Sequence, residues 1–218
     1  QLLEYDDVAN QQRQLIYDQR RQLMESDDIS ETVEAFRETV LDNVFHQYVP
    51  PRSVEEEWDT AGLEDGLFHT FGMHLPVRQW LEADASLHEE TLKQRLWEAV
   101  TEQYREKESQ VGTEVMREFE KVVALQVLDT QWKDHLSAMD HLKEGIHLRG
   151  YAQRQPIQEF KREAFTMFEE LLERFKQETV ELLYKVQVRA EQDVEAFEEE
   201  RSEPHDLQYQ HPTAEGAV

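Results

Sequence analysis

The chain has 218 residues, and its 48 acidic and 23 basic side chains give it a net charge of −25. This charge argues against nucleic acid as a partner, because phosphate backbones would be repelled, and against broad electrostatic binding to anionic lipid. The absence of cysteine excludes disulfides and thiolate metal sites. No apolar run approaches the roughly 18 residues that predict a membrane-spanning helix.

The composition favours helices throughout the chain. Only 7 glycines and 6 prolines are present, while the good helix formers Glu, Gln, Leu and Arg are abundant. No segment alternates apolar and polar residues between turn signals, as a half-buried strand would. We therefore predict an all-α fold of one or two domains with a thin, extended core.

Residues 1–26 are predicted to form the first long helix, because their apolar side chains recur at helical spacing. No capping residue precedes this helix, so we expect that it continues from a preceding segment and is truncated at its start. Its apolar face would then be partly exposed, and such a face could bring two copies of the chain together as a homodimer. Ser26–Ser30, a polar break rich in capping residues, marks the first domain boundary.

Residues 27–112 are predicted to form a small inserted helical domain. Its first helix is stopped by Pro50–Pro51, and capping boxes at Ser53–Glu56 and Ser86–Glu89 predict two further helix starts. Pro76 opens a short helix between them. The predicted core of this domain is aromatic and consists of Trp58, Phe68, Phe71, Trp80 and Trp97. A ligand pocket among these rings is the alternative interpretation.

Residues 113–189 are predicted to form an antiparallel hairpin of two long helices, separated from the inserted domain by Gly112. Gly145–Pro156 interrupts the apolar pattern, since glycine allows the backbone angles of a turn and proline suits the first turn of a helix. The first apolar stripe comprises Val115, Phe119, Val122, Leu125, Leu128, Trp132, Leu136, Met139, Leu142 and Ile146. The second comprises Phe160, Ala164, Phe168, Leu171, Phe175, Thr179, Leu182 and Val186.

The predicted tip of the hairpin, near residues 144–156, differs in charge from the rest of the chain. Between Lys143 and Arg162 there are five basic and two acidic residues, which gives a local net charge of +3. Tyr151 lies in the break, where neither apolar stripe extends to cover it. In one interpretation Tyr151 folds back onto the hairpin and the arginines cap carbonyls at a helix end. In the other, which we favour, the tip projects and contacts something flexible, apolar or acidic.

No pattern in the sequence predicts catalysis. The chain has no Gly-Lys-Ser or Gly-Lys-Thr loop for phosphate and no cysteine nucleophile. Glu144 and His147 have the spacing of helical metal ligands, but Gly145 is expected to interrupt the helix, so we predict no metal site. A metal-dependent helical enzyme is the alternative, which elemental analysis would test. We assign five further ionisable residues to the polar faces of the first hairpin helix: Asp129, Asp134, His135, Asp140 and His141.

Residues 190–218 form an acidic tail in this interpretation. Residues 190–203 contain seven acidic residues and one arginine, and few apolar residues follow them. We predict a frayed helix and then disorder, because such a segment buries too little apolar surface to fold.

Four strings of residues carry a resemblance to a known family. They are Leu3–Val8 (LEYDDV), Leu125–Asp140 (LQVLDTQWKDHLSAMD), Gly145–Gln153 (GIHLRGYAQ) and Lys185–Arg189 (KVQVR). In this order, over about residues 2–189, they resemble the SecA family of bacterial preprotein translocase ATPases. The resemblance implies a helical scaffold domain interrupted by a helical wing domain, with the hairpin as the two-helix finger.

The resemblance also implies a role for the tip. The finger would enter the cytoplasmic mouth of the SecY channel, and Tyr151 would be the fingertip tyrosine that touches the translocating polypeptide. The contact residues beside it would be Leu148, Arg149, Gly150 and Ala152. Gln155 stands where the family usually has Asp, and this poorer N-cap would weaken the helix start by about 1 kcal/mol. Phe160 stands where family members often have Tyr.

By this resemblance the chain is a noncatalytic fragment that couples ATP-driven motion of motor domains to preprotein movement and helps regulate the ATPase. ATP and magnesium would bind the motor domains, and the fragment itself would hold no cofactor. The implied partners are the SecA motor domains, the SecYEG channel and unfolded preproteins, at the cytoplasmic face of the bacterial inner membrane as a peripheral protein. The cysteines of the family's zinc-binding tail are absent, so binding of the chaperone SecB is not implied. The alternative is a free-standing acidic helical adaptor that binds partner helices.

Overall fold

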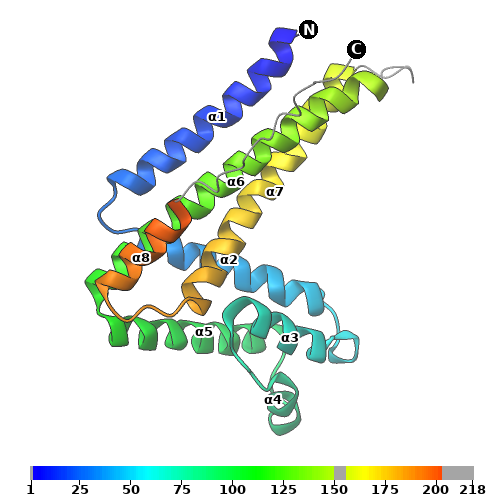
Figure 1. Cartoon of the computed structure of the whole chain (residues 1–218). Helices are drawn as coiled ribbons and strands as arrows, with labels where there is room; N and C mark the ends of the chain where they lie inside the picture. The colour runs from blue at the N-terminus through cyan, green and yellow to red at the C-terminus, as the bar shows by residue number, and fades with distance from the viewer. Residues whose placement is uncertain (1, 150–155, 203–218) are drawn as a thin grey trace, which may run out of the picture.

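The computed structural model of the chain describes residues 2–149 and 156–202 and, within them, the side chains of residues 4–146 and 156–199. In these ranges the chain forms eight α-helices and one short 3-10 helix, with no strand (Figure 1). The α-helices are α1 (Leu2–Glu25), α2 (Ser30–Tyr48), α3 (Thr60–Phe71), α4 (Val77–Ala83), α5 (Glu89–Val111), α6 (Thr113–Arg149), α7 (Pro156–Lys185) and α8 (Glu191–Ser202). The 3-10 helix spans Glu55–Glu57. The predicted all-α class is confirmed.

The two longest helices, α6 and α7, pack against each other as an antiparallel hairpin (Figure 1). The 37 residues of α6 make it about 55 Å long at 1.5 Å per residue. Helix α6 continues through Gly145 to Arg149, so the expected interruption at Gly145 was wrong. A single glycine inside a helix costs only about 1 kcal/mol relative to alanine, and the helical turns on both sides outweigh that cost.

Helix α1 lies along the hairpin and runs antiparallel to α6 (Figure 1). Near the start of α1, Lys143 Nζ donates to Asp6 Oδ1 at 2.9 Å. Near its end, Lys121 Nζ donates to the carbonyl oxygen of Met24 at 2.6 Å. Contacts at both ends of α1 therefore bind it along the hairpin, and we call α1, α6 and α7 together the three-helix arm.

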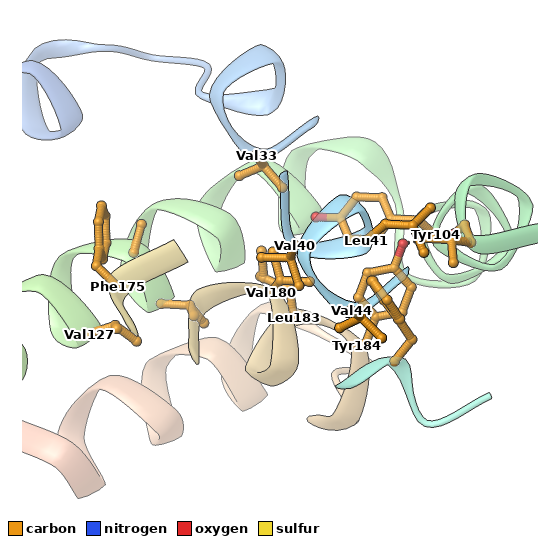
Figure 2. Close-up of a cluster of buried hydrophobic side chains, with 14 of the residues drawn as sticks. Val33, Val40, Leu41, Val44, Tyr104, Val127, Phe175, Val180, Leu183 and Tyr184 are labelled. Atoms are coloured by element: carbon orange, nitrogen blue, oxygen red, sulfur yellow. Dashed lines mark hydrogen bonds between the residues drawn. The ribbon is translucent and has the colours of Figure 1, made fainter. Parts of the chain in front are cut away.

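Helices α2 to α5 lie at the base of the three-helix arm (Figure 1). Breaks between helices fall at both predicted boundaries, in residues 26–29 and at Gly112. One continuous hydrophobic core, the main core, nevertheless extends from α1 through α8. Figure 2 shows its centre, where α2, α5, α6 and α7 meet at Val33, Val40, Leu41, Val44, Tyr104, Val127, Phe175, Val180, Leu183 and Tyr184. The separate folding of residues 27–112 stays a prediction.

The first predicted capping box was wrong. Ser53 Oγ donates to the carbonyl oxygen of Pro50 and accepts the indole N–H of Trp58 at 2.9 Å, so it caps no helix. Helix α3 begins later, after Asp59, whose Oδ1 accepts from the backbone N–H of Gly62 at 2.8 Å. A serine hydroxyl in a turn can hydrogen-bond to a backbone carbonyl of that turn instead of capping a helix. The next side-chain acceptor along the chain, the Asp59 carboxylate, then serves as the N-cap.

The second capping box was displaced by two residues. The N-cap of α5 is His88, whose Nδ1 accepts from the backbone N–H of Thr91 at 3.3 Å. The Thr91 hydroxyl accepts from the His88 backbone N–H at 2.9 Å, which completes a reciprocal pair. Ser86 instead donates to Asp84 within the preceding turn.

The predicted aromatic core of the inserted region was wrong for most of its members. Phe71 is buried, but Phe68 is 40% exposed and stacks on His74, and the three tryptophans are half-buried. Arginine side chains cover two of those rings, Arg37 at Trp97 and Arg95 at Trp80. Aliphatic side chains fill the interior instead: Leu63, Leu67, Val77, Leu92, Leu96 and Val100. Close helix packing leaves room for aliphatic groups, while flat rings cover the edges.

The expectation of a frayed helix after residue 190 was also wrong. Helix α8 packs against α6, with Val194 buried and the ring of Phe197 edge-on to Phe119 at 5.9 Å. Two apolar side chains three residues apart give α8 a buried face despite its acidic composition. The remainder of the predicted tail, residues 203–218, lies outside the described residues.

Replacing Gly112 by alanine is expected to lower the free energy of unfolding by about 2 kcal/mol, since its φ of +94° strains any side chain. An added Cβ would meet nothing within 4 Å, so the penalty comes from the backbone alone. Gly145→Ala is the control: it also enters open space, but inside a helix, and should stabilise by up to about 1 kcal/mol. Urea unfolding followed by circular dichroism measures both, and equal effects would contradict the prediction.

Candidate functional site

The candidate site is the distal end of the hairpin, where α6 ends at Arg149 and α7 begins at Pro156. Of the five predicted contact residues, Gly150, Tyr151 and Ala152 lie outside the described residues. The backbones of Leu148 and Arg149 form the last turn of α6, but their side chains are also outside the described part of the chain. The role of these five residues therefore stays a prediction. The structure does show which contacts pack the end of α6 and the start of α7 together.

A small hydrophobic cluster holds the distal helix ends together. We call it the distal cluster, and its buried members are Tyr5, Met139, Leu142, Ile146, Phe160 and Ala164. The rings of Tyr5 and Phe160 meet edge-on with centroids 4.7 Å apart, which joins α1 to the first turns of α7. Phe160 lacks the hydroxyl of a tyrosine but keeps this ring contact. The distal cluster thus positions the residues on both sides of the predicted tip.

The charge of the distal end is less positive than the linear sequence predicts. Lys143 of α6 pairs with Asp6 of α1, which lies far away in the sequence and was not part of the local count. Arg162 lies 3.6 Å from Glu159 within α7, but that carboxylate is already included in the local count. The Asp6 carboxylate thus offsets one positive charge of the basic segment.

A buried polar layer lies next to the distal cluster. The side chain of Gln12 donates from Nε2 to the carbonyl oxygen of Ala164 at 3.0 Å, and its Oε1 lies 2.7 Å from His135 Nε2. A carbonyl can only accept, so this orientation of Gln12 requires His135 to carry its proton on Nε2. We call Gln12, His135 and the Ala164 carbonyl the polar layer. It links α1, α6 and α7 at one level.

His135 is held neutral by its surroundings. Its ring stacks against Trp132 with centroids 5.6 Å apart and lies near Phe168, and only 2% of the residue is exposed. Burial, and secondly the charge of Arg174, lowers the pKa of His135 to about 4. The assignment of His135 to a polar helix face was therefore wrong. The signal that could have placed it inside is its position between Trp132 and Met139 at steps of three and four residues.

A groove of about 680 Å³ lies between α1 and α7 beside the polar layer. Its lining includes the apolar side chains of Val8, Leu15, Phe165, Phe168 and Leu172 and the carboxylates of Glu4, Asp7 and Glu169. Leu15 is 59% exposed and Phe165 is 61% exposed. The sequence analysis missed Phe165, although an aromatic residue off the apolar stripe of its helix was a usable signal. This apolar groove with acidic side chains suits apolar contacts from another chain segment.

A second buried polar network lies at the junction of α5 and α6, which we call the elbow. Tyr104 donates its hydroxyl to Glu120 Oε1 at 2.7 Å, and Arg117 Nη2 lies 3.2 Å from the same oxygen. Arg117 also pairs with Glu108 at 3.1 Å. These contacts join the two helices on either side of Gly112, so they oppose a change of the angle between them.

The ionisable groups of the elbow are strongly perturbed. Burial raises the pKa of Glu120 to about 7 and, with the adjacent Glu120 charge, holds the pKa of Tyr104 well above its usual value. Burial lowers the pKa of Lys107 to about 8. Lys107 Nζ donates to the carbonyl oxygens of Leu183 and Val186 at the end of α7, where helix carbonyls lack partners. These groups bond to one another and to helix carbonyls where α5, α6 and α7 meet, so their arrangement is structural.

The described residues offer little for metal chemistry or membrane insertion. Among them, no group of three or more His, Asp or Glu side chains is arranged to hold a metal ion. The side chain of His147, half of the Glu144 and His147 pair, lies outside the described residues. None of the helices, over the residues that the structure covers, is long and apolar enough to cross a membrane.

The sequence that forms this arrangement matches one known family. A profile described as the SecA Wing and Scaffold domain matches residues 1–187. The chain belongs to the SecA family. The matched region ends two residues after α7, so it contains the three-helix arm and the inserted helices but not α8.

Individual relatives agree with the SecA assignment. Proteins described as protein translocase subunit SecA from Nitrosococcus oceani, Pseudomonas putida and Methylococcus capsulatus are 55%, 51% and 51% identical to this chain. The comparisons cover 98%, 99% and 97% of the chain, so they include α8. The chain spans about a quarter of the length of these relatives, at 24%, 24% and 23%.

Proposed function

We propose that this chain is the scaffold and wing portion of a protein-translocating SecA subunit, and that it transmits motion without catalysing a reaction. The observation that carries the proposal is the three-helix arm. Helix α1 is bound to the hairpin near the distal end through Asp6 and Lys143 and near the base through Lys121 and Met24. A displacement of α1 would therefore be passed to the end of the hairpin.

The distal end of the hairpin is proposed to contact the substrate, an unfolded preprotein, and the mouth of the SecYEG channel. Tyr151 would make the central contact, with Leu148, Arg149, Gly150 and Ala152 beside it. A tyrosine suits this task because a flat amphipathic ring can contact many different sequences. The distal cluster supports the proposal, since it fixes the helix turns on both sides of this segment.

The outer face of α1 is proposed to pack against the motor domains of the longer protein. Support comes from Tyr17 and Met24, two large side chains seven residues apart on one side of α1 that are about half exposed. ATP and magnesium would bind those motor domains, and this chain would hold no cofactor and hydrolyse no ATP. It would restrain hydrolysis through this contact and work at the cytoplasmic face of the inner membrane as a peripheral protein. The same face could also associate with a second copy.

Site-specific photo-crosslinking tests the contact at the tip. A photoreactive amino acid is placed at position 151 of the chain, joined to its motor domains and bound to SecYEG with a stalled preprotein. Position 174 serves as the matched control, because Arg174 lies on the exposed side of the α7 shaft. We expect crosslinks to the preprotein from position 151 and none from position 174.

Two results would contradict the proposal. Absence of crosslinks from position 151 in a complex that still translocates would make Tyr151 a packing residue. Equal crosslinking from both positions would show that the preprotein contacts the whole hairpin and not its end.

A further inference from the structure

The polar layer divides the three-helix arm into two hydrophobic parts. On one side lies the distal cluster, and on the other lies the main core, which begins with Ile16, Trp132 and Phe168. Gln12 and His135 are both buried between these two parts. Every helix of the arm contributes one polar group to this layer, and hydrogen bonds of 2.7 and 3.0 Å join the three groups.

The apolar layers of the arm do not by themselves specify one register. Along α6 the inward-facing residues alternate steps of four and three, as in a coiled coil: Leu128, Trp132, His135, Met139, Leu142 and Ile146. Apolar side chains are not directional in their contacts, so a helix shifted by one turn can still bury much of its apolar face. The pattern alone therefore permits neighbouring registers.

The polar layer discriminates between these registers. A shift of α1 by one turn, about 5.4 Å, would move Gln12 away from both His135 and the Ala164 carbonyl. The amide and the imidazole would then be buried against apolar groups without partners, which costs far more than a satisfied pair gains. A single buried polar residue fixes register in coiled coils by the same mechanism.

We infer that Gln12 and His135 are positioning residues that set the axial register of α1 on the α6–α7 hairpin. The inference rests on the proposed function in one respect, namely that the position of the hairpin end relative to α1 matters for preprotein contact. The register itself is a property of this chain. Gln12 and His135 act at a distance from the tip, through the helices that they join.

Distance measurements between spin labels test the register directly. The chain has no cysteine, so the variant with Asn10→Cys and Glu170→Cys carries labels only at these exposed positions of α1 and α7. Pulsed electron paramagnetic resonance should give one narrow distance distribution in this background. Adding Gln12→Leu and His135→Leu should produce a second population at a different distance, since a shift of one helical turn moves α1 by about 5.4 Å along its axis. The melting temperature should be unchanged or higher, because apolar residues replace a buried polar pair.

Leu142→Ala in the distal cluster is the control for general loosening. It should lower the melting temperature but keep the single narrow distance, because the polar layer is intact. A single narrow distance in the Gln12→Leu, His135→Leu variant would overturn the inference. Should that variant not fold, Gln12→Leu alone removes the acceptor of His135 and should give the same second distance; a single distance there would overturn the inference equally.

The register and the proposed function can fail independently. A second distance population together with absent crosslinks from position 151 would support the register role and contradict the contact at the tip. Crosslinks from position 151 with one unchanged distance in the double variant would support the contact and overturn the register role.

Discussion

Replacing Phe119 by alanine is expected to lower the free energy of unfolding by about 3–5 kcal/mol, the usual cost of removing a fully buried ring. Phe119 is 0% exposed in the main core, where it contacts Phe197 of α8 and lies beneath the ammonium group of Lys107. Urea unfolding measures the loss. Phe165→Ala removes the same ring from an exposed position of α7 and should change stability by no more than about 0.5 kcal/mol.

Phe160→Ala extends this comparison to the distal cluster. Phe160 is buried like Phe119, but it belongs to the smaller cluster beyond the polar layer. Its loss should therefore open the distal turns of α6 and α7 while the main core keeps its protection. Hydrogen exchange distinguishes the two regions. If Phe160→Ala lowered amide protection in α2 and α5 as much as in residues 139–146, the two clusters would form a single cooperative unit.

The sequence was most informative along the distal half of α6, which packs against α1 and α7. In the distal half of α6, the predicted stripe residues Trp132, Met139, Leu142 and Ile146 are buried, and Leu136 is half-buried. In its basal half, contacts with α5, α7 and α8 cover more than one face of the helix. Buried residues there include several outside the predicted stripe: Met116, Glu120, Val123, Ala124 and Val127. An apolar stripe predicts one buried face of a helix, and it does not indicate how many other helices cover the remaining faces.

Buried polar groups were the hardest features to predict. Gln12, His135 and Glu120 have the residue types of a solvated helix face, and each is buried because its partner comes from another helix. A helical periodicity assigns positions to faces, whereas a satisfied polar contact depends on how distant helices meet. Local sequence also did not decide which cap would start a helix, since Ser53 found a nearer acceptor in its own turn.

The pH dependence of stability should reveal two buried groups with opposite effects. The pKa of His135 is about 4 in the fold against an ordinary value of 6.5. Between these values the unfolded chain binds a proton that the folded chain does not, so stability falls as the pH falls. The pKa of Glu120 is about 7 against an ordinary value of 4.5. Here the folded chain binds the extra proton, so stability rises as the pH falls through the same range.

Each effect amounts to about 3 kcal/mol at most, since one unit of pKa difference corresponds to about 1.4 kcal/mol. The two contributions largely cancel in the unmodified chain and should appear when either group is removed. Glu120→Gln can still accept the hydrogen bond from Tyr104. As the pH is lowered from 7.5 to 4.5, its free energy of unfolding should fall by up to about 3 kcal/mol more than that of the unmodified chain. His135→Gln still offers a donor to Gln12. Over the same pH range its free energy of unfolding should rise relative to that of the unmodified chain by a similar amount.

Urea unfolding of the three proteins at a series of pH values provides the measurement. The surface carboxylates are common to all three proteins, so differences between variants isolate the two buried groups. The charged groups that act on the pKa of Glu120 are Arg117, Glu108 and Asp28. The charged group that acts on the pKa of His135 is Arg174. Identical pH profiles for both variants and the unmodified chain would contradict the buried, oppositely perturbed states of Glu120 and His135. Opposite slopes would establish that the elbow and the polar layer respond to protons in opposite directions.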